Sequence, residues 1–144
     1  MMKILGIIVS CFMLGQSVFA AAPLTGYLTV ADEVPPAVVA LLHDAKEAFV
    51  AGDSEKAASL LERALRIEPR HPVLWHNLAG VRLQQADWRR AANLANKSNT
   101  LASNNENYTW LRVRNWVVIS LACEGMKDKE CALNARKRAS ILAN

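Results

Sequence analysis

The sequence predicts an all-α protein built from about three stacked helical hairpins, with six helices in all. The main observation is an internal repeat. Two stretches align at a spacing of 34 residues, which pairs Asp53 with Asp87, and a third follows at a spacing of 41, which places Asp128 at the same position. Within each stretch, apolar residues recur at steps of three and four, as on a helix with one buried face. Repeats of this length are typical of helical solenoids, in which each hairpin packs only against its neighbours.

The first 20 residues are expected to be a cleaved secretory signal peptide. Lys3 precedes an apolar run of about 16 residues, and the small residue Ala20 follows it. One alternative is a retained anchor, because such a run is close to the shortest length that spans a membrane. Lipidation of Cys11 is another, since residues 8–11 resemble the lipobox of bacterial lipoproteins. The apolar run before Cys11 is very short, however, so we favour cleavage.

Residues 21–36 are predicted to be a flexible linker, because they contain prolines and a glycine without a helical period. The helical domain follows over residues 37–144. Its first helix starts after a proline pair, which suits a first helical turn, and stops at Gly52. Asp53 is expected to cap the second helix, which ends at Pro69.

The second and third hairpins repeat this pattern. Pro72 starts the third helix, and Asp87 is expected to cap the fourth. Residues 106–112 are then extra to the 34-residue spacing. They amount to about two helical turns, so we expect them to lengthen the fifth helix while nearly preserving its buried face. The fifth helix should end near Gly125, and Asp128 should cap the sixth.

These residues resemble the tetratricopeptide repeat (TPR), a pair of antiparallel helices with the pattern W-x-x-L-G-x-x-Y … G … A-x-x-x-F-x-x-A … P. The first copy, residues 38–71, matches at Leu41, Ala45, Ala48, Gly52, Ala57, Leu61, Ala64 and Pro69. The second, residues 72–105, matches at Trp75, Leu78, Ala79 and Ala91. The third, about residues 113–144, lacks the glycine and matches only at Trp116, Ile119, Ser120, Ala132 and Ala139.

The resemblance implies that a partner lies in a concave groove lined by the first helix of each hairpin. These groove positions carry over to Leu42, Lys46, Phe49, His76, Asn77, Leu83 and Arg114. Asn77 lies where some TPR proteins hold a partner's C-terminal carboxylate, with Arg114 to assist it; alternatively, Asn77 bonds a neighbouring backbone group. Phe49 and Leu83 would form an apolar floor for an amphipathic helix or extended peptide, unless they are buried against the next repeat.

A disulfide between Cys123 and Cys131 is expected. The two residues flank the turn at Gly125, so an antiparallel hairpin would bring their Cα atoms within the roughly 4.4–6.8 Å that a disulfide requires. Export to an oxidising compartment favours the bond. The alternative is a pair of small buried thiols.

No catalytic or metal-binding pattern is found in the sequence. His43, His71 and His76 have neither an i, i+4 histidine partner nor a neighbouring cysteine. A phosphate-binding glycine loop and a nucleophile elbow are also absent from the sequence. We therefore expect no metal, no cofactor and no enzymatic activity.

Together these observations predict a non-catalytic protein–protein interaction adaptor or assembly factor of the bacterial cell envelope, periplasmic or secreted after signal cleavage. Its partner would be another protein. One alternative is self-association as a homodimer. Another is an accessory factor for anionic cell-wall or lipid ligands, because the excess of Lys and Arg lies in residues 72–144. Export argues against nucleic acid, and we expect membrane contact only if the leader is retained or Cys11 is lipidated.

Overall fold

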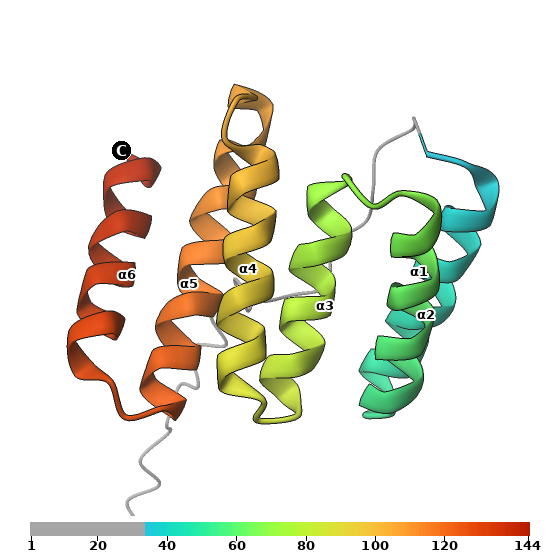
Figure 1. Ribbon diagram of the computed structural model, residues 1–144, viewed down its shortest axis with the longest axis horizontal. Coiled ribbons are helices and arrows are strands. Elements are labelled where there is room, and N and C mark those ends of the chain that lie inside the picture. The colour runs from blue at the N-terminus through green and yellow to red at the C-terminus, as the bar shows by residue number, and fades with distance from the viewer. Residues whose placement is uncertain (1–33) are drawn as a thin grey trace, which may run out of the picture.

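The computed structural model describes residues 34–144, which form three antiparallel hairpins and contain no strand. The elements are α1 (Pro36–Val50), α2 (Ser54–Ile67), α3 (Pro72–Gln84), α4 (Trp88–Ala102), the short 3-10 helix η1 (Glu106–Tyr108), α5 (Thr109–Gly125) and α6 (Lys129–Ala143). The hairpins α1–α2, α3–α4 and α5–α6 stand side by side in one row, with α6 at one end (Figure 1). The predicted all-α fold of six helices is confirmed.

The described residues begin within the last part of the predicted linker. Helix α1 starts at Pro36, and Val34 packs against the core of the first hairpin. The predicted signal peptide, residues 1–20, and the rest of the linker lie outside the described residues. Among the helices of residues 34–144, none is long and apolar enough to cross a membrane.

The second helix of every hairpin is capped in the same way. The carboxylates of Asp53, Asp87 and Asp128 each accept a hydrogen bond from the backbone N–H three residues further on, at 3.0, 3.4 and 3.0 Å. Such a cap satisfies one of the backbone donors that a helix start leaves unpaired. The repeat spacings of 34 and 41 residues are therefore reproduced in the hydrogen bonding of the turns.

The residue before each cap has a left-handed backbone conformation. Its φ angle is 80° at Gly52, 58° at Ala86 and 61° at Lys127. Glycine adopts this conformation without steric cost, whereas a residue with a Cβ atom does not. The second and third hairpins thus keep the left-handed backbone of the turn, although neither has a glycine at this position.

Two apolar clusters form most of the core. The first joins the first hairpin to α3 and consists of Val38, Leu42, Ala45, Ala48, Ala57, Ala58, Leu60, Leu61, Ala64, Leu65, Leu74, Leu78 and Val81. The second joins the second hairpin to the third and consists of Ala79, Ala95, Val118, Ile119, Cys123, Ala132 and Ala135. Ala57 and Ala91 are fully buried, as expected of small residues at which two helices approach closely.

Residues 106–112 do more than lengthen the fifth helix. They form η1 and the first turn of α5. Leu111 is fully buried and packs with Val73 and Ala102, and Tyr108 lies against the same cluster. The extra residues therefore also cover one end of α3 and α4, which the helical spacing alone did not predict.

Candidate functional site

The seven predicted groove residues lie on the first helices α1, α3 and α5, and we call the surface that carries their positions the first-helix face. Their exposure differs. Leu42, His76 and Asn77 are buried, Phe49, Leu83 and Arg114 are half-buried, and Lys46 is exposed. This face therefore presents fewer of these side chains to a partner than the resemblance implies.

Phe49 and Leu83 pack mainly against the protein itself. Phe49 lies against the first core cluster, and Leu83 lies against the second and beside Trp88. The sequence left open whether these two form a groove floor or are buried against neighbouring elements, and their packing favours burial. The more exposed apolar side chains of this face are Val39 and Val50 on α1, 50% and 77% exposed, and Leu121 on α5, 38% exposed.

A buried polar network joins the second and third hairpins. His76 Nδ1 and Asn115 Oδ1 are 2.7 Å apart, and both side chains are buried. Asn115 Nδ2 donates to Ser98 Oγ at 2.8 Å and to Asn99 Oδ1 at 3.0 Å. Ser98 Oγ in turn donates to the Pro72 carbonyl oxygen at 2.8 Å. These side chains come from α3, α4 and α5, so the network ties three helices together.

The network determines the state of His76. Because Asn115 donates through its nitrogen, its oxygen accepts, and Nδ1 of His76 carries the hydrogen. Burial lowers the pKa of His76 to about 4, which the hydrogen bond to Asn115 opposes and the nearby Arg114 reinforces. His76 is therefore a neutral, 1% exposed residue of the repeat junction. This role could not be predicted from the sequence, because Asn115 lies 39 residues away in no recurring pattern.

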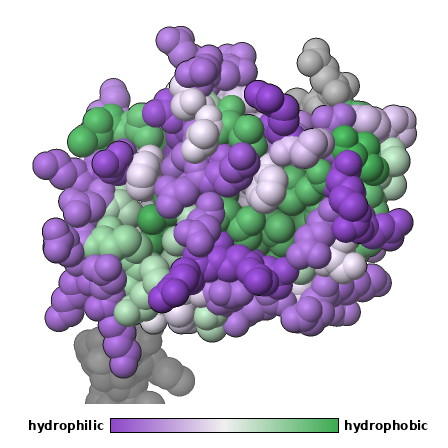
Figure 2. All heavy atoms as spheres, viewed as in Figure 1, coloured by the Kyte–Doolittle hydropathy of each residue, from purple (hydrophilic) through white to green (hydrophobic). Residues whose placement is uncertain are grey.

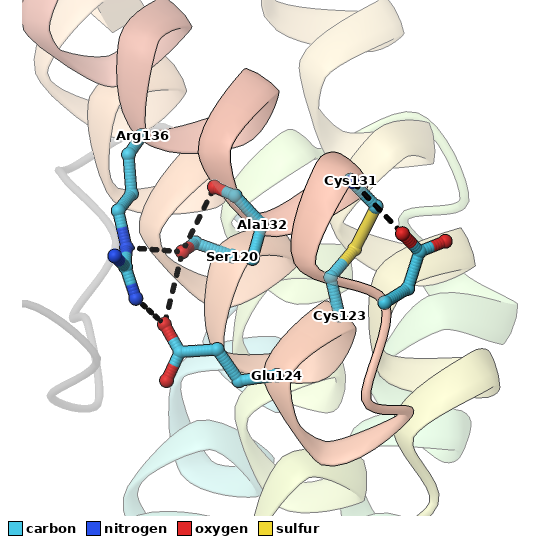
Figure 3. Close-up of a disulfide and its surroundings, with 7 residues drawn as sticks. Ser120, Cys123, Glu124, Cys131, Ala132 and Arg136 are labelled. Carbon is cyan, nitrogen blue, oxygen red and sulfur yellow. Dashed lines mark hydrogen bonds and ion pairs between the residues drawn. A yellow bond between two sulfur atoms is a disulfide. The ribbon is translucent and has the colours of Figure 1, made fainter.

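The third hairpin is joined by a disulfide. Cys123 and Cys131 are bonded, with their Cα atoms 5.7 Å apart, within the range that a disulfide requires (Figure 3). Cys131 N also donates to the Asp128 cap at 3.0 Å. The bond therefore links the last turn of α5 to the first turn of α6.

A polar cluster holds the same two helices elsewhere along the hairpin (Figure 3). Arg136 on α6 forms an ion pair with Glu124 on α5, and its Nε donates to Ser120 Oγ at 3.2 Å. Ser120 Oγ lies 3.4 Å from the Ala132 carbonyl oxygen. The terminal hairpin is thus joined by covalent, ionic and neutral contacts.

A hollow of about 510 Å³ lies over α3, between α2 and α4. Figure 2 shows hydrophobic residues gathered there, with hydrophilic residues around them. Its lining includes Trp75, Leu94, Arg66 and Arg90. Sequence reasoning assigned Trp75 only to the packing pattern of the repeat. The signal available in the sequence was the pair Arg66 on α2 and Arg90 on α4, since these helices come before and after α3, which carries Trp75.

One group in residues 34–144 has the spacing of a metal site. His43, Asp44 and Glu47 place their ligand atoms within 4.8 Å of one another. All three are exposed, and exposed acidic groups of this kind are common without an ion. Their arrangement gives no support for a metal centre.

Comparison with known proteins places the chain in a family. A family model described as "Tetratricopeptide repeat" matches residues 48–109. Among solved structures, the globular C-terminal domain of P. aeruginosa LpoP is 34% identical, with a TM-score of 0.69, and the match covers 75% of this chain and 99% of that domain. The chain belongs to the tetratricopeptide repeat family. Among curated proteins, none matches significantly.

The extent of the TPR match agrees with the quality of the repeats. It ends at Thr109, where α5 begins, so it contains the second hairpin and part of the first but not the third. The third copy is also the one that departs most from the pattern. TPR membership supports an interaction role and a protein partner, and it points away from catalysis.

Proposed function

We propose that this TPR protein is a non-catalytic adaptor or assembly factor of the bacterial cell envelope, which binds a peptide or helix of another protein on its first-helix face. The observation that carries the proposal is a TPR solenoid with apolar side chains exposed on two of its first helices. Val39 on α1 is 50% exposed and lies on the same side of that helix as the charged Lys46, and Leu121 on α5 is 38% exposed. Apolar anchors flanked by charge are what an amphipathic segment recognises.

The predicted residues that contribute to this surface are a subset. Lys46 is exposed and Arg114 is half-buried, so we expect both to contribute at the rim. Phe49 and Leu83 contribute from below, through the part of each side chain that remains exposed. Leu42, His76 and Asn77 are buried and would support the surface from inside the stack.

Export is part of the same proposal. The disulfide between Cys123 and Cys131 supports an oxidising compartment, because such bonds are rare in the reducing cytosol of most organisms. The predicted signal peptide of residues 1–20 leads to the same compartment. We therefore place the mature protein in the periplasm or outside the cell.

The test uses crosslinking and affinity capture from envelope extracts. A variant with Val39→Asp, Lys46→Glu and Leu121→Asp should lose a discrete protein that the wild type recovers. Phe49 and Leu83 are poor choices here, because they pack against the core. Circular dichroism melting of each variant confirms that it folds.

A matched control changes the same kinds of residue on the outer helix α6. Leu133, Lys137 and Ile141 are exposed, so Leu133→Asp, Lys137→Glu and Ile141→Asp introduce the same charges elsewhere. The control should capture as the wild type does. If both variants capture equally, binding on the first-helix face is refuted.

Self-association is the second candidate, and one observation favours it. Leu133 and Ile141 are 63% and 65% exposed on α6, the terminal helix of the row, against which no further hairpin packs in residues 34–144. Light scattering across a range of concentrations tests it. A mass that doubles with concentration in the wild type, but not in the α6 variant, would favour a dimer over a monomeric adaptor.

A further inference from the structure

The hollow over α3 differs in position from the surface of the proposed function. It is lined by Glu62, Leu65, Arg66, Pro69, Trp75, Leu78, Arg82, Arg90 and Leu94. At about 100° of rotation per residue, Trp75, Leu78 and Arg82 lie on roughly the opposite side of α3 from His76 and Gly80. We call this hollow the α2–α4 groove.

The floor of the α2–α4 groove is apolar. Leu65 and Leu78 are buried, and Trp75 and Leu94 are half-buried. The indole N–H of Trp75 donates to the Pro69 carbonyl oxygen at 2.8 Å, which fixes the ring and satisfies its polar atom. The floor therefore offers aromatic and aliphatic surface, and the indole N–H of Trp75 does not require a hydrogen-bond acceptor from the partner.

One arginine is held in place at the end of this floor. Arg82 Nη2 donates to Glu62 Oε1 at 2.8 Å, and Arg82 Nη1 donates to Gln85 Oε1 at 2.8 Å. Its side chain is only 12% exposed. Arg82 is thus a fixed part of the wall, and it neutralises the only acidic residue of the lining.

The two other arginines stand on opposite walls. Arg66 on α2 and Arg90 on α4 are both exposed. Within residues 34–144, Arg66 forms no ion pair, and Arg90 has only a surface pair with Asp87, at 3.6 Å. Two cations therefore face an apolar floor with little compensation from the protein.

The corresponding place on the third hairpin is built differently. At the spacing of 41 residues, Arg82 and Arg90 correspond to Cys123 and Cys131, which are bonded to each other. Trp116, the counterpart of Trp75, lines a separate hollow between α5 and α6. The arginines at positions 82 and 90 are therefore particular to the second hairpin and are not a general property of the fold.

We propose that the α2–α4 groove docks an acidic amphipathic segment of a partner protein. Its apolar side chains contact Trp75 and Leu94, and its carboxylates pair with Arg66 and Arg90. The apolar floor favours a peptide over a free anion, which would gain nothing from it. Walls on two sides favour a protruding segment over a flat membrane surface. Charge complementarity selects an acidic sequence and rejects a basic one.

The test selects binders from a displayed library of random peptides about four helical turns long, using the purified protein as bait. The enriched peptides are then titrated against an Arg66→Glu, Arg90→Glu variant and a milder Arg66→Gln, Arg90→Gln variant. The control is Arg63→Glu, Arg89→Glu. It changes the same charge on the same two helices at exposed positions outside the groove. Melting curves establish that all variants fold.

The expected peptides combine Asp or Glu with apolar residues at helical spacing. Charge reversal should weaken them by about tenfold or more, the glutamine variant by less, and the control by under about twofold. Their affinity should also fall with added salt, because the arginines are exposed.

Three outcomes would overturn the proposal: no enriched peptide, enrichment without acidic residues, or equal binding to wild type and the charge-reversed variant. Peptides that depend instead on Val39 and Leu121 would also overturn it. That last result would leave the first-helix face standing as the site of the proposed function, so the two proposals can fail separately.

Discussion

The second and third hairpins share a backbone but use the same positions differently. On the second hairpin, three of these positions line one groove; on the third, two of them form a disulfide and the third lines a separate hollow. The pairs are Trp75 with Trp116, Arg82 with Cys123 and Arg90 with Cys131. Arg138 lies over the ring of Trp116, 4.9 Å from its centroid, whereas the indole N–H of Trp75 donates to the Pro69 carbonyl oxygen; both rings are half-buried. The two repeats therefore place different chemistry at the same positions.

The first and third hairpins lie at the two ends of the row, and each has only one neighbour to pack against within residues 34–144. Each therefore gains less from stacking than the second hairpin between them. The apolar cluster of the third hairpin is built largely from alanines. The disulfide, the Arg136–Glu124 ion pair and the His76 network supply contacts that the first hairpin obtains from leucines.

The largest expected effect is a loss of stability in acid at the junction of the second and third hairpins. Burial lowers the pKa of His76 to about 4, from the usual histidine value of about 6.5. As the pH falls, the unfolded chain binds the proton first. Stability is therefore complete above about pH 6.5 and falls by roughly 3 kcal/mol as the pH approaches 4. The lowered pKa of His71, also caused by burial, acts in the same direction.

Urea unfolding at several pH values measures this effect, and His76→Gln is the control. The variant has a lower free energy of unfolding throughout, but it should show a shallower dependence on pH between 6.5 and 4. Equal slopes for wild type and variant would mean that His76 does not titrate with folding.

The next effect concerns the disulfide, which the second hairpin lacks. Replacing both cysteines, Cys123→Ser with Cys131→Ser, should lower the free energy of unfolding by about 2–3 kcal/mol, as expected for a short closed loop. Hydrogen exchange should show protection lost first in α6. The first hairpin contains no cysteine and serves as an internal reference. Uniform loss across all helices would contradict a local role.

The third prediction compares the effect on stability of an alanine at the last residue of α5 and at the last residue of α3. Gly125 on α5 lies so close to Trp88 on α4 that an added Cβ atom would be 2.3 Å from the ring. Gly125→Ala should therefore destabilise the protein by about 1–3 kcal/mol through overpacking. Gln84 occupies the equivalent position on α3 and is exposed, and it accepts only a surface hydrogen bond from Ser54, so Gln84→Ala should cost at most about 0.5 kcal/mol. Thermal melting compares the two, and an equal response would show that Trp88 can move aside.

Features that depend on local sequence were predictable. The caps at Asp53, Asp87 and Asp128 and the ends of the hairpins follow from residues a few positions apart. The repeat spacing of 34 and then 41 residues allowed the helix ends assigned in one copy to be assigned in the next. The disulfide was predictable for the same reason, because a hairpin turn separates its two cysteines by only eight positions.

Features that depend on three helices at once were not predictable. The burial of His76 requires Asn115 from another repeat, and the groove requires side chains of α2, α3 and α4 together. The family pattern placed His76 and Asn77 on a binding face because it describes positions along one helix. It does not report how closely the next repeat packs on that helix.

The smallest expected effect tests the turns, in which the hairpins differ by one residue. Ala86 and Lys127 hold φ angles of 58° and 61° where the first hairpin has Gly52. Replacing Ala86 with glycine should raise the free energy of unfolding by up to about 1 kcal/mol, because the left-handed conformation then carries no steric cost. The reverse change, Gly52→Ala, should lower it by a similar amount. In a domain of this size, either change should shift the melting temperature by about 4 °C. A fall in melting temperature for Ala86→Gly would show that flexibility gained by the unfolded chain outweighs the strain relieved, and that the second hairpin tolerates its turn without loss.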